Sequence, residues 1–242
     1  MLITNFLQER QHLYLLMLMI FALISSSTSA TLQVSPVTLM LKGNKQSENL
    51  WLNNDGDRII SAQVRVFNWT QSDFTDKYES TRNIVVSPPI VTIMPGQRQL
   101  VRIINISSPY DRAEHAYRLS VNELPAPFQK MNQLQFLLHY SIPVFHIPES
   151  DTLPTVELKW NIYQHNESVY LDVTNQGTGH AQLSEATWVN HSGERREISK
   201  GLMGYVLSGS TMRWVIPGQS GVNFQGGKLE VTVNGQKTVQ PL

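Results

Sequence analysis

The sequence YRLSVN at Tyr117–Asn122 alternates apolar and polar side chains. Successive side chains of a β-strand point to opposite faces, so this pattern predicts a strand with one buried face and one exposed face. The same period of two recurs at residues 62–66, 169–173 and 229–233. The alternation therefore indicates half-buried strands along most of the chain.

Clusters of turn-forming residues separate these runs. Residues that favour tight turns, such as Gly, Pro, Asn and Asp, gather at residues 53–57, 94–96, 175–177, 217–218 and 234–235. Short strands separated by such turns are typical of antiparallel β-sandwiches. Because no segment after residue 30 sustains the 3.6-residue apolar period of a helix, we expect an all-β fold.

The composition is that of a globular protein without thiol chemistry. The 242 residues are 41% hydrophobic and 16% charged. Lys plus Arg and Asp plus Glu number 19 each, so the net charge gives no reason to expect a nucleic-acid partner. The chain has no cysteine, which excludes disulfides and thiolate metal sites. Core packing must therefore hold the fold together.

The first 30 residues are typical of a cleavable signal peptide. The apolar run Leu13–Ile24 follows a polar start, and Ala30 offers a small residue at the cleavage site. The run is short for a hydrocarbon layer of about 30 Å. We expect a mature chain that starts near Thr31 and does not insert into a membrane. The alternative is an uncleaved N-terminal anchor.

A polar segment with two prolines, His146–Pro154, divides the mature chain. Proline stiffens a connection and cannot donate to a strand ladder. The predicted domains are residues 31–147 and 153–242. Each has a length that suits one immunoglobulin-like sandwich.

The longest alternating run is LQFLLHYSIPV, at Leu134–Val144. Its apolar face would carry Leu134, Phe136, Leu138, Tyr140, Ile142 and Val144. Pro143 cannot donate a ladder hydrogen bond, so the strand lies at a sheet edge or frays there. Residues 131–148 contain no Asp, Glu, Lys or Arg, the charges with which edge strands resist aggregation. The run is either a strand of the chain's own core or one offered to another chain by β-augmentation.

Further short motifs are spread over the mature chain. They are Leu50–Asn54, Ser87–Gln97, Leu100–Ile103, Tyr117–Pro125, Val144–Pro148 and, more loosely, Trp214–Gly218. In this order the motifs resemble those of the PapD-like periplasmic pilus-assembly chaperones. The resemblance implies two immunoglobulin-like β-sandwich domains in an L shape, in a periplasmic chaperone for pilus subunits.

In that family the last long strand of the N-terminal domain completes a subunit that lacks its own final strand. An outer-membrane usher then receives the complex. The resemblance therefore favours the donor-strand interpretation of Leu134–Val144. The residues that would fill the subunit's groove are Leu134, Phe136, Leu138 and Tyr140.

Typical members of the family hold the subunit's C-terminal carboxylate with an Arg on the first strand and a Lys on the donor strand. Here those positions are Thr38 and Pro143, so the resemblance points to the non-classical, archaic branch and to a different anchor. An Arg side chain binds a carboxylate bidentately. We expect Arg118, which alternates away from the core beside the donor strand, to be the anchor, with Arg102 as the second candidate.

The alternative for both arginines is an internal ion pair, with Glu123 or Asp111 as candidate partners.

The histidines lack zinc-ligand spacing, and no nucleotide-binding or hydrolase motif occurs, so we expect no enzyme activity, metal or cofactor. The alternative function is structural: a pilus subunit or sandwich adhesin. Such a subunit would need an incomplete sandwich, whereas the patterns here suit two complete halves. An exported sugar-binding or hydrolytic sandwich is a third class, which the dispersed tryptophans disfavour.

Overall fold

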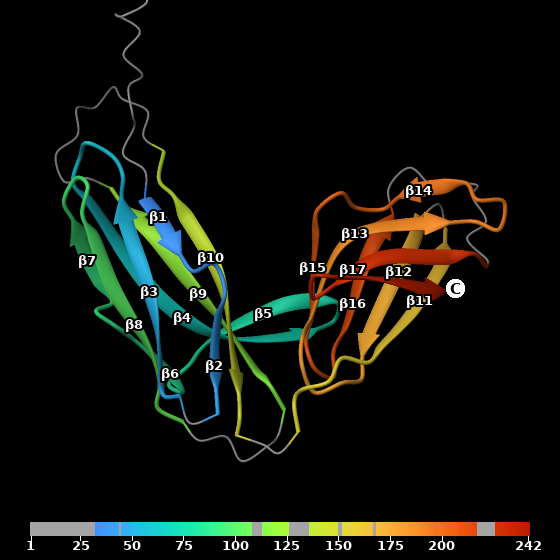
Figure 1. Cartoon of the computed structure of the whole chain (residues 1–242), viewed down its shortest axis with the longest axis horizontal. Coiled ribbons are helices and arrows are strands. Elements are labelled where there is room, and N and C mark those ends of the chain that lie inside the picture. Colours follow the sequence, from blue (N-terminus) through green and yellow to red (C-terminus); the bar gives the residue numbers. More distant parts are fainter. Residues whose placement is uncertain are drawn as a thin grey trace, which may run out of the picture.

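The computed structural model describes residues 32–43, 45–107, 113–125, 136–149, 152–166, 168–216 and 226–242. Within these ranges the regular secondary structure consists of strands β1 to β18, without a helix. Figure 1 shows that the strands form two sandwich lobes that meet at an angle. The predicted all-β fold, with two sandwiches in an L shape, is confirmed.

The first lobe packs a four-stranded sheet against a six-stranded sheet (Figure 1). The smaller sheet has the order β1 (Leu32–Ser35), β3 (Ser47–Asn54), β8 (Arg98–Asn105), β6 (Ile84–Ser87). The larger sheet has the order β2 (Leu39–Lys42), β10 (His139–Ile147), β9 (His115–Leu124), β4 (Ile60–Ser72), β5 (Thr75–Ser80), with β7 (Ile90–Ile93) also paired to β4.

The second lobe begins with β11 and also contains two sheets. The smaller has the order β11 (Leu158–His165), β12 (Ser168–Asn175), β16 (Thr211–Ile216). The larger has the order β14 (Arg195–Glu197), β13 (Ala181–Val189), β17 (Lys228–Val233), β18 (Gln236–Pro241), with β15 (Leu202–Val206) also paired to β13.

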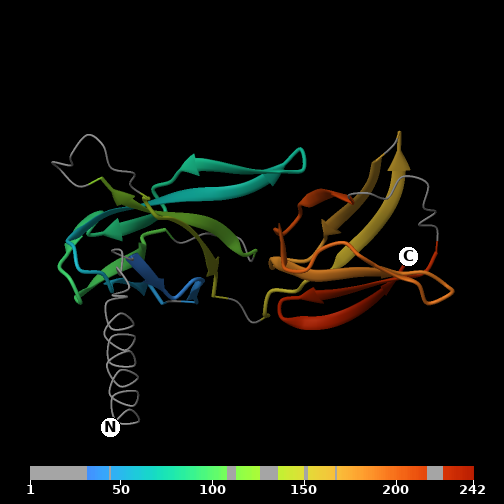
Figure 2. The same ribbon diagram turned by 90° about the horizontal axis from the view of Figure 1, so that it is seen from above.

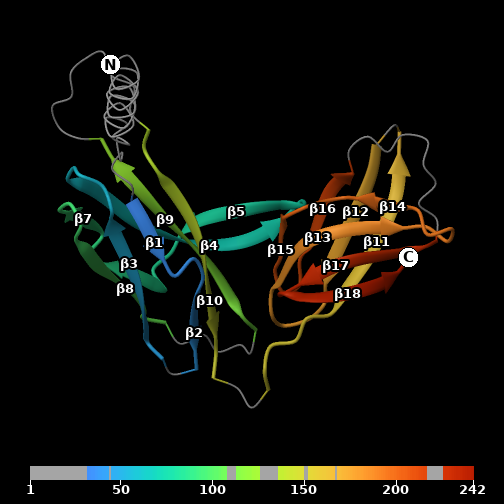
Figure 3. The ribbon, with the colours of Figure 1, turned by 45° about the horizontal axis from the view of Figure 1, so that its top comes forward.

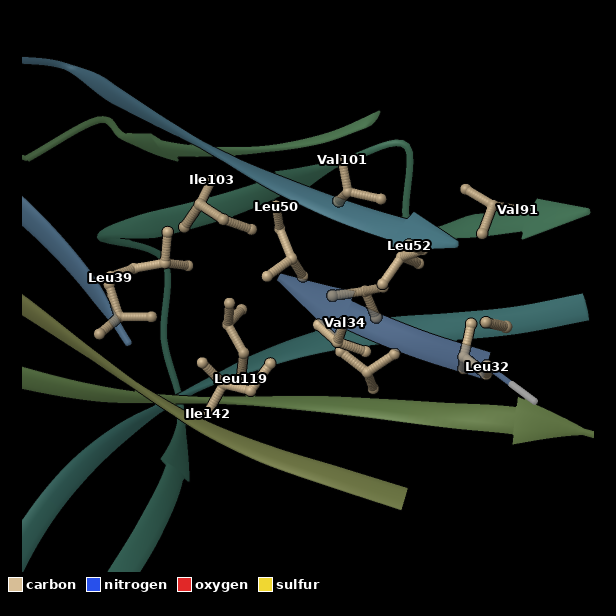
Figure 4. Close-up of a cluster of buried hydrophobic side chains, with 14 of the residues drawn as sticks. Leu32, Val34, Leu39, Leu50, Leu52, Val91, Val101, Ile103, Leu119 and Ile142 are labelled. Carbon is tan, nitrogen blue, oxygen red and sulfur yellow. The ribbon is translucent and has the colours of Figure 1, made fainter. Parts of the chain in front are cut away.

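The alternating residues of the first lobe form its core, which Figure 4 shows between the two sheets. Leu50 and Val101 come from the smaller sheet, whereas Leu119 and Ile142 come from the larger one. All four are at most 2% exposed. Each fully buried side chain of this kind contributes about 1.5–3 kcal/mol of transfer free energy. The sandwich is therefore held by apolar burial, as a chain without cysteine requires.

The two lobes contact each other through a cluster of aromatic side chains. Trp69 and Phe145 come from the first lobe, and Tyr205 comes from β15 of the second. The Trp69 and Tyr205 ring centroids lie 5.3 Å apart, edge to face. The Phe145 ring stacks on the His180 ring at 3.5 Å, and His180 Nδ1 lies 2.7 Å from the buried Glu114 carboxylate. Apolar and polar contacts together thus join the lobes.

A hairpin of β4 and β5 extends from the first lobe to the second (Figures 2 and 3). Its turn residues Asp73 and Phe74 both have positive φ, 54° and 61°, as in a two-residue type I′ turn. The Arg213 guanidinium lies 3.7 Å from the Phe74 ring centroid. Gln71 accepts a hydrogen bond from the Leu207 N–H and donates one to the Tyr205 carbonyl. The hairpin is therefore a second connection between the lobes.

We predict that Leu119→Ala lowers the free energy of unfolding by about 2–5 kcal/mol, because Leu119 is fully buried and its loss leaves a cavity. Leu153→Ala is the matched control, since Leu153 is 86% exposed and a surface change of this kind stays within about 0.5 kcal/mol. Urea unfolding followed by circular dichroism measures both. Equal midpoints for the two variants would contradict the core described above.

Candidate functional site

β10 is paired along one edge, whereas among the described strands its other edge is paired over only about half of its length. It pairs antiparallel with β9 from His139 to His146. On its other edge it pairs with β2, parallel, only from Val144 onwards. Among the described residues, no strand pairs with that edge from His139 to Pro143. An unpaired edge of this kind can accept a strand of another chain.

The predicted position of Pro143 at a sheet edge agrees with this geometry. Pro143 pairs with Arg118 across the β9–β10 ladder, and the pairing with β2 begins at the next residue. Because proline has no N–H, it leaves no backbone donor unsatisfied on the open edge. The strand can therefore change partners at this point without losing a ladder hydrogen bond from residue 143.

The four predicted groove-filling residues differ in their exposure and in their position relative to β10. Leu134 lies outside the described residues. Phe136 is 82% exposed and precedes the strand, which begins at His139. Leu138 and Tyr140 are half-buried and pack against the core of the first lobe.

Tyr140 also has a polar contact within its own lobe. Its hydroxyl donates to the Leu32 carbonyl, and burial followed by the Glu123 charge raises the pKa of the phenol. The Leu138 N–H donates to the Glu123 carboxylate. Glu123 therefore interacts with the residue that precedes β10, and among the described ion pairs it has none with Arg118.

Arg118, the predicted carboxylate anchor, lies on the outer face of the larger sheet. Arg118 lies between the buried residues Tyr117 and Leu119 of β9 and points away from the core, as the alternation predicted. Its guanidinium lies 3.7 Å from the Trp69 ring centroid and 5.5 Å from that of Tyr205. None of the ion pairs in the described part of the chain includes Arg118. Its Nε is buried and has no hydrogen-bond partner there.

The side chains beneath Arg118 come from both lobes. Trp69 is 2% exposed, and its indole N–H donates to Asp76 Oδ1 at 2.9 Å. Tyr205 comes from the second lobe, and its ring contacts Trp69 edge to face and lies near the same guanidinium. Aromatic faces stabilise a cation without neutralising its charge. The site thus presents an Arg side chain, fixed on aromatic rings, next to the open half of β10.

Arg102 and Thr38 lie elsewhere. Arg102 is exposed on β8, in the smaller sheet of the first lobe, between the buried residues Val101 and Ile103. Its side chain therefore points away from the larger sheet, which contains β10. Thr38 precedes β2 and lines a cavity of about 260 Å³ that Phe145 and other residues of both lobes border. Asp111, a candidate partner for the arginines, lies outside the described residues.

Sequence reasoning missed Trp69 and Tyr205, which support Arg118. One signal was present: Phe67 and Trp69 continue the outward-facing positions of Arg65 on β4, where polar residues are expected. Large aromatic side chains at outward positions indicate that another part of the chain covers them. Tyr205 carried no comparable signal.

The described ranges contain no group of three or more His, Cys, Asp or Glu side chains that could hold a metal ion. They also contain no helix with the length and apolar character that a membrane span needs.

The family model of the PapD N-terminal domain, described as a pili and flagellar-assembly chaperone, matches residues 31–151. This match covers the whole of the first lobe, including β10 and Arg118. No curated protein sequence matches the chain.

Several solved structures are similar to this chain over most of its length. A chain of the CsuC–CsuE chaperone–tip adhesion subunit pre-assembly complex, from the archaic chaperone-usher Csu pili of Acinetobacter baumannii, has a TM-score of 0.71 and 25% identity, and the match covers 88% of this chain and 98% of that one. The YadV chaperone has a TM-score of 0.64 and 18% identity, over 87% of this chain and 99% of that one.

A chain of the Salmonella enterica complex of SafA pilin with the SafB chaperone has a TM-score of 0.63 and 15% identity. The match covers 90% of this chain and 98% of that one. At these low identities the YadV and SafB comparisons show the fold alone.

Proposed function

Since the chain belongs to the family of PapD-like pili and flagellar-assembly chaperones, we propose that it stabilises unfinished pilus subunits by donating an edge strand to them. The observation that carries this proposal is the open edge of β10 from His139 to Pro143. A subunit strand that pairs there would gain backbone hydrogen bonds.

Apolar residues that precede β10 in the sequence, together with Tyr140 within it, would supply the rest of the binding energy. Leu134, Phe136, Leu138 and Tyr140 are the residues that we propose fill the subunit's groove. Four large side chains contribute roughly 6–12 kcal/mol before the costs of ordering and association are subtracted. Leu138 and Tyr140 would have to exchange part of their contact with the first lobe's core for contact with the subunit. Such binding is firm but leaves room for exchange at the usher.

We propose Arg118 as the anchor for the subunit's C-terminal carboxylate. Arg118 pairs with Pro143 of β10, and β2 occupies the other edge of β10 from the next residue onwards. A subunit strand aligned on the open edge would therefore end near the Arg118 guanidinium. Among the described residues, this guanidinium takes part in none of the ion pairs with a carboxylate. Arg102 points away from this face and is not part of the proposed site.

The proposed setting is the periplasm, with residues 1–30 as a cleaved signal peptide and domains at 31–147 and 153–242. Pilus subunits would be the cargo, and an outer-membrane usher would receive them. The similarity to the Csu complex supports a place in the archaic branch. We propose no enzymatic activity.

A pilus subunit or adhesin is the less supported alternative. A subunit that awaits a donor strand has an incomplete core, whereas each lobe here has a closed apolar core between two sheets.

We predict that Leu138→Asp abolishes the recovery of soluble subunit when chaperone and pilus subunit are co-expressed, because a charge at this position cannot enter an apolar groove. Co-purification on a tag carried by the chaperone measures the complex. Leu137→Asp is the matched control, since Leu137 is the neighbouring leucine and is already 42% exposed. If subunit co-purifies equally with both variants, strand donation through Leu138 is wrong.

Arg118→Ala should weaken subunit binding by about ten- to a hundredfold, the range that corresponds to one lost charge-assisted hydrogen-bonding group. Arg118→Lys should retain part of the affinity, and Arg102→Ala should leave it unchanged. Surface plasmon resonance with purified subunit gives the dissociation constants. A larger loss for Arg102→Ala than for Arg118→Ala would contradict this choice of anchor.

A further inference from the structure

The carboxylate of Asp76 is close to Arg118 but does not form an ion pair with it. Both groups contact the same indole: the Arg118 guanidinium lies over the Trp69 ring at 3.7 Å, and Asp76 Oδ1 accepts the Trp69 N–H at 2.9 Å. Opposite charges that contact the same side chain ordinarily attract each other. Their failure to pair therefore needs a structural reason.

Three neutral donors occupy the oxygens of Asp76. Oδ1 accepts hydrogen bonds from Trp69 Nε1 and from Gln71 Nε2, both at 2.9 Å. Oδ2 accepts one from the Tyr78 hydroxyl at 3.2 Å. Each of these donors lies on the β4–β5 hairpin with Asp76 itself. The hairpin therefore satisfies its own carboxylate.

Tyr78 lies close to both charged groups. Trp69 and Tyr78 are opposite one another in the β4–β5 ladder, so both side chains lie on the face that carries Arg118. Burial raises the pKa of the Tyr78 phenol, Asp76 raises it further, and Arg118 lowers it. The hydroxyl thus hydrogen-bonds to the Asp76 carboxylate on the face of the sheet that also carries Arg118.

From this geometry we infer that the Tyr78 hydroxyl is a spacer, which keeps the Asp76 carboxylate from pairing with Arg118 and so leaves Arg118 available to an incoming carboxylate. Tyr78 is a positioning residue in this arrangement, since it acts through Arg118. The inference rests on the proposed role of Arg118 as the carboxylate anchor.

The contact between the lobes supports the same arrangement. The Gln71 amide that binds Asp76 also binds the backbone of Tyr205 and Leu207 in the second lobe. Tyr205 in turn faces Arg118 at 5.5 Å. Asp76 is therefore held in place by a side chain that is itself fixed between the lobes, which limits its movement towards Arg118.

The test uses the full mature chain and a synthetic peptide, acetyl-Val-Thr-Val-Thr-Phe, as the free acid and as its C-terminal amide. Nitrogen-15 NMR follows the Arg118 Nε–H signal, which Arg118→Lys identifies by its disappearance. In the wild type, the acid should shift this signal and the amide should not. Tyr78→Phe removes only the hydroxyl, and we expect it to weaken binding of the acid by roughly two- to fivefold, the range of an exposed ion pair.

A second substitution separates a spacer from a merely structural tyrosine. With Tyr78→Phe in place, Asp76→Asn removes the competing charge and should restore binding of the acid to the wild-type value. Tyr170→Phe is the matched control, because Tyr170 lies near Arg213 in the second lobe, and it should leave binding unchanged.

The possible failures are distinguishable. If acid and amide shift the Arg118 signal equally in the wild type, Arg118 is not a carboxylate anchor, and the role of Tyr78 falls with it. If the acid alone binds but Tyr78→Phe binds it as well as the wild type does, only the spacer role is overturned. If Asp76→Asn does not restore binding in the Tyr78→Phe background, Asp76 is not the competitor and the inference is equally overturned.

Discussion

The pairing of β10 with β9 is the interaction on which the functional face depends. Along this ladder Ile142 and Val144 enter the core of the first lobe, which fixes β10 from one side. Within the described ranges, no strand pairs with the other edge until β2 joins at Val144. The same ladder places Arg118 opposite Pro143. One strand pair thus sets both the exposed backbone edge and the position of the cation beside it.

The contact between the lobes adds the second half of the site. Trp69 supports Arg118 from the first lobe, whereas Tyr205 comes from the second. Because the β4–β5 hairpin also bonds to the second lobe through Gln71, the angle between lobes and the environment of Arg118 are linked. A chain without cysteine obtains this rigidity from ring packing and buried hydrogen bonds.

The sequence predicted those features that depend on a local period. Alternation at Tyr117–Asn122 correctly predicted that Leu119 is buried and that Arg118 points away from the core. The apolar face of Leu134–Val144 was less informative, because the described strand starts at His139 and both of its faces are buried from Ile142 to His146. Phe145 is covered by His180 of the other lobe. Contacts such as that of Gln71 with Leu207 join residues 136 positions apart, and no local pattern contains them.

Hydrogen exchange at β10 tests strand donation most directly. The backbone amides of residues 139–142 that do not bond to β9 should exchange quickly in the free protein and become protected when a pilus subunit binds. Amides of β9 should change little, because their partners in β10 and β4 are already in place. Protection that appears elsewhere on the protein while residues 139–142 still exchange quickly would contradict donation of this edge.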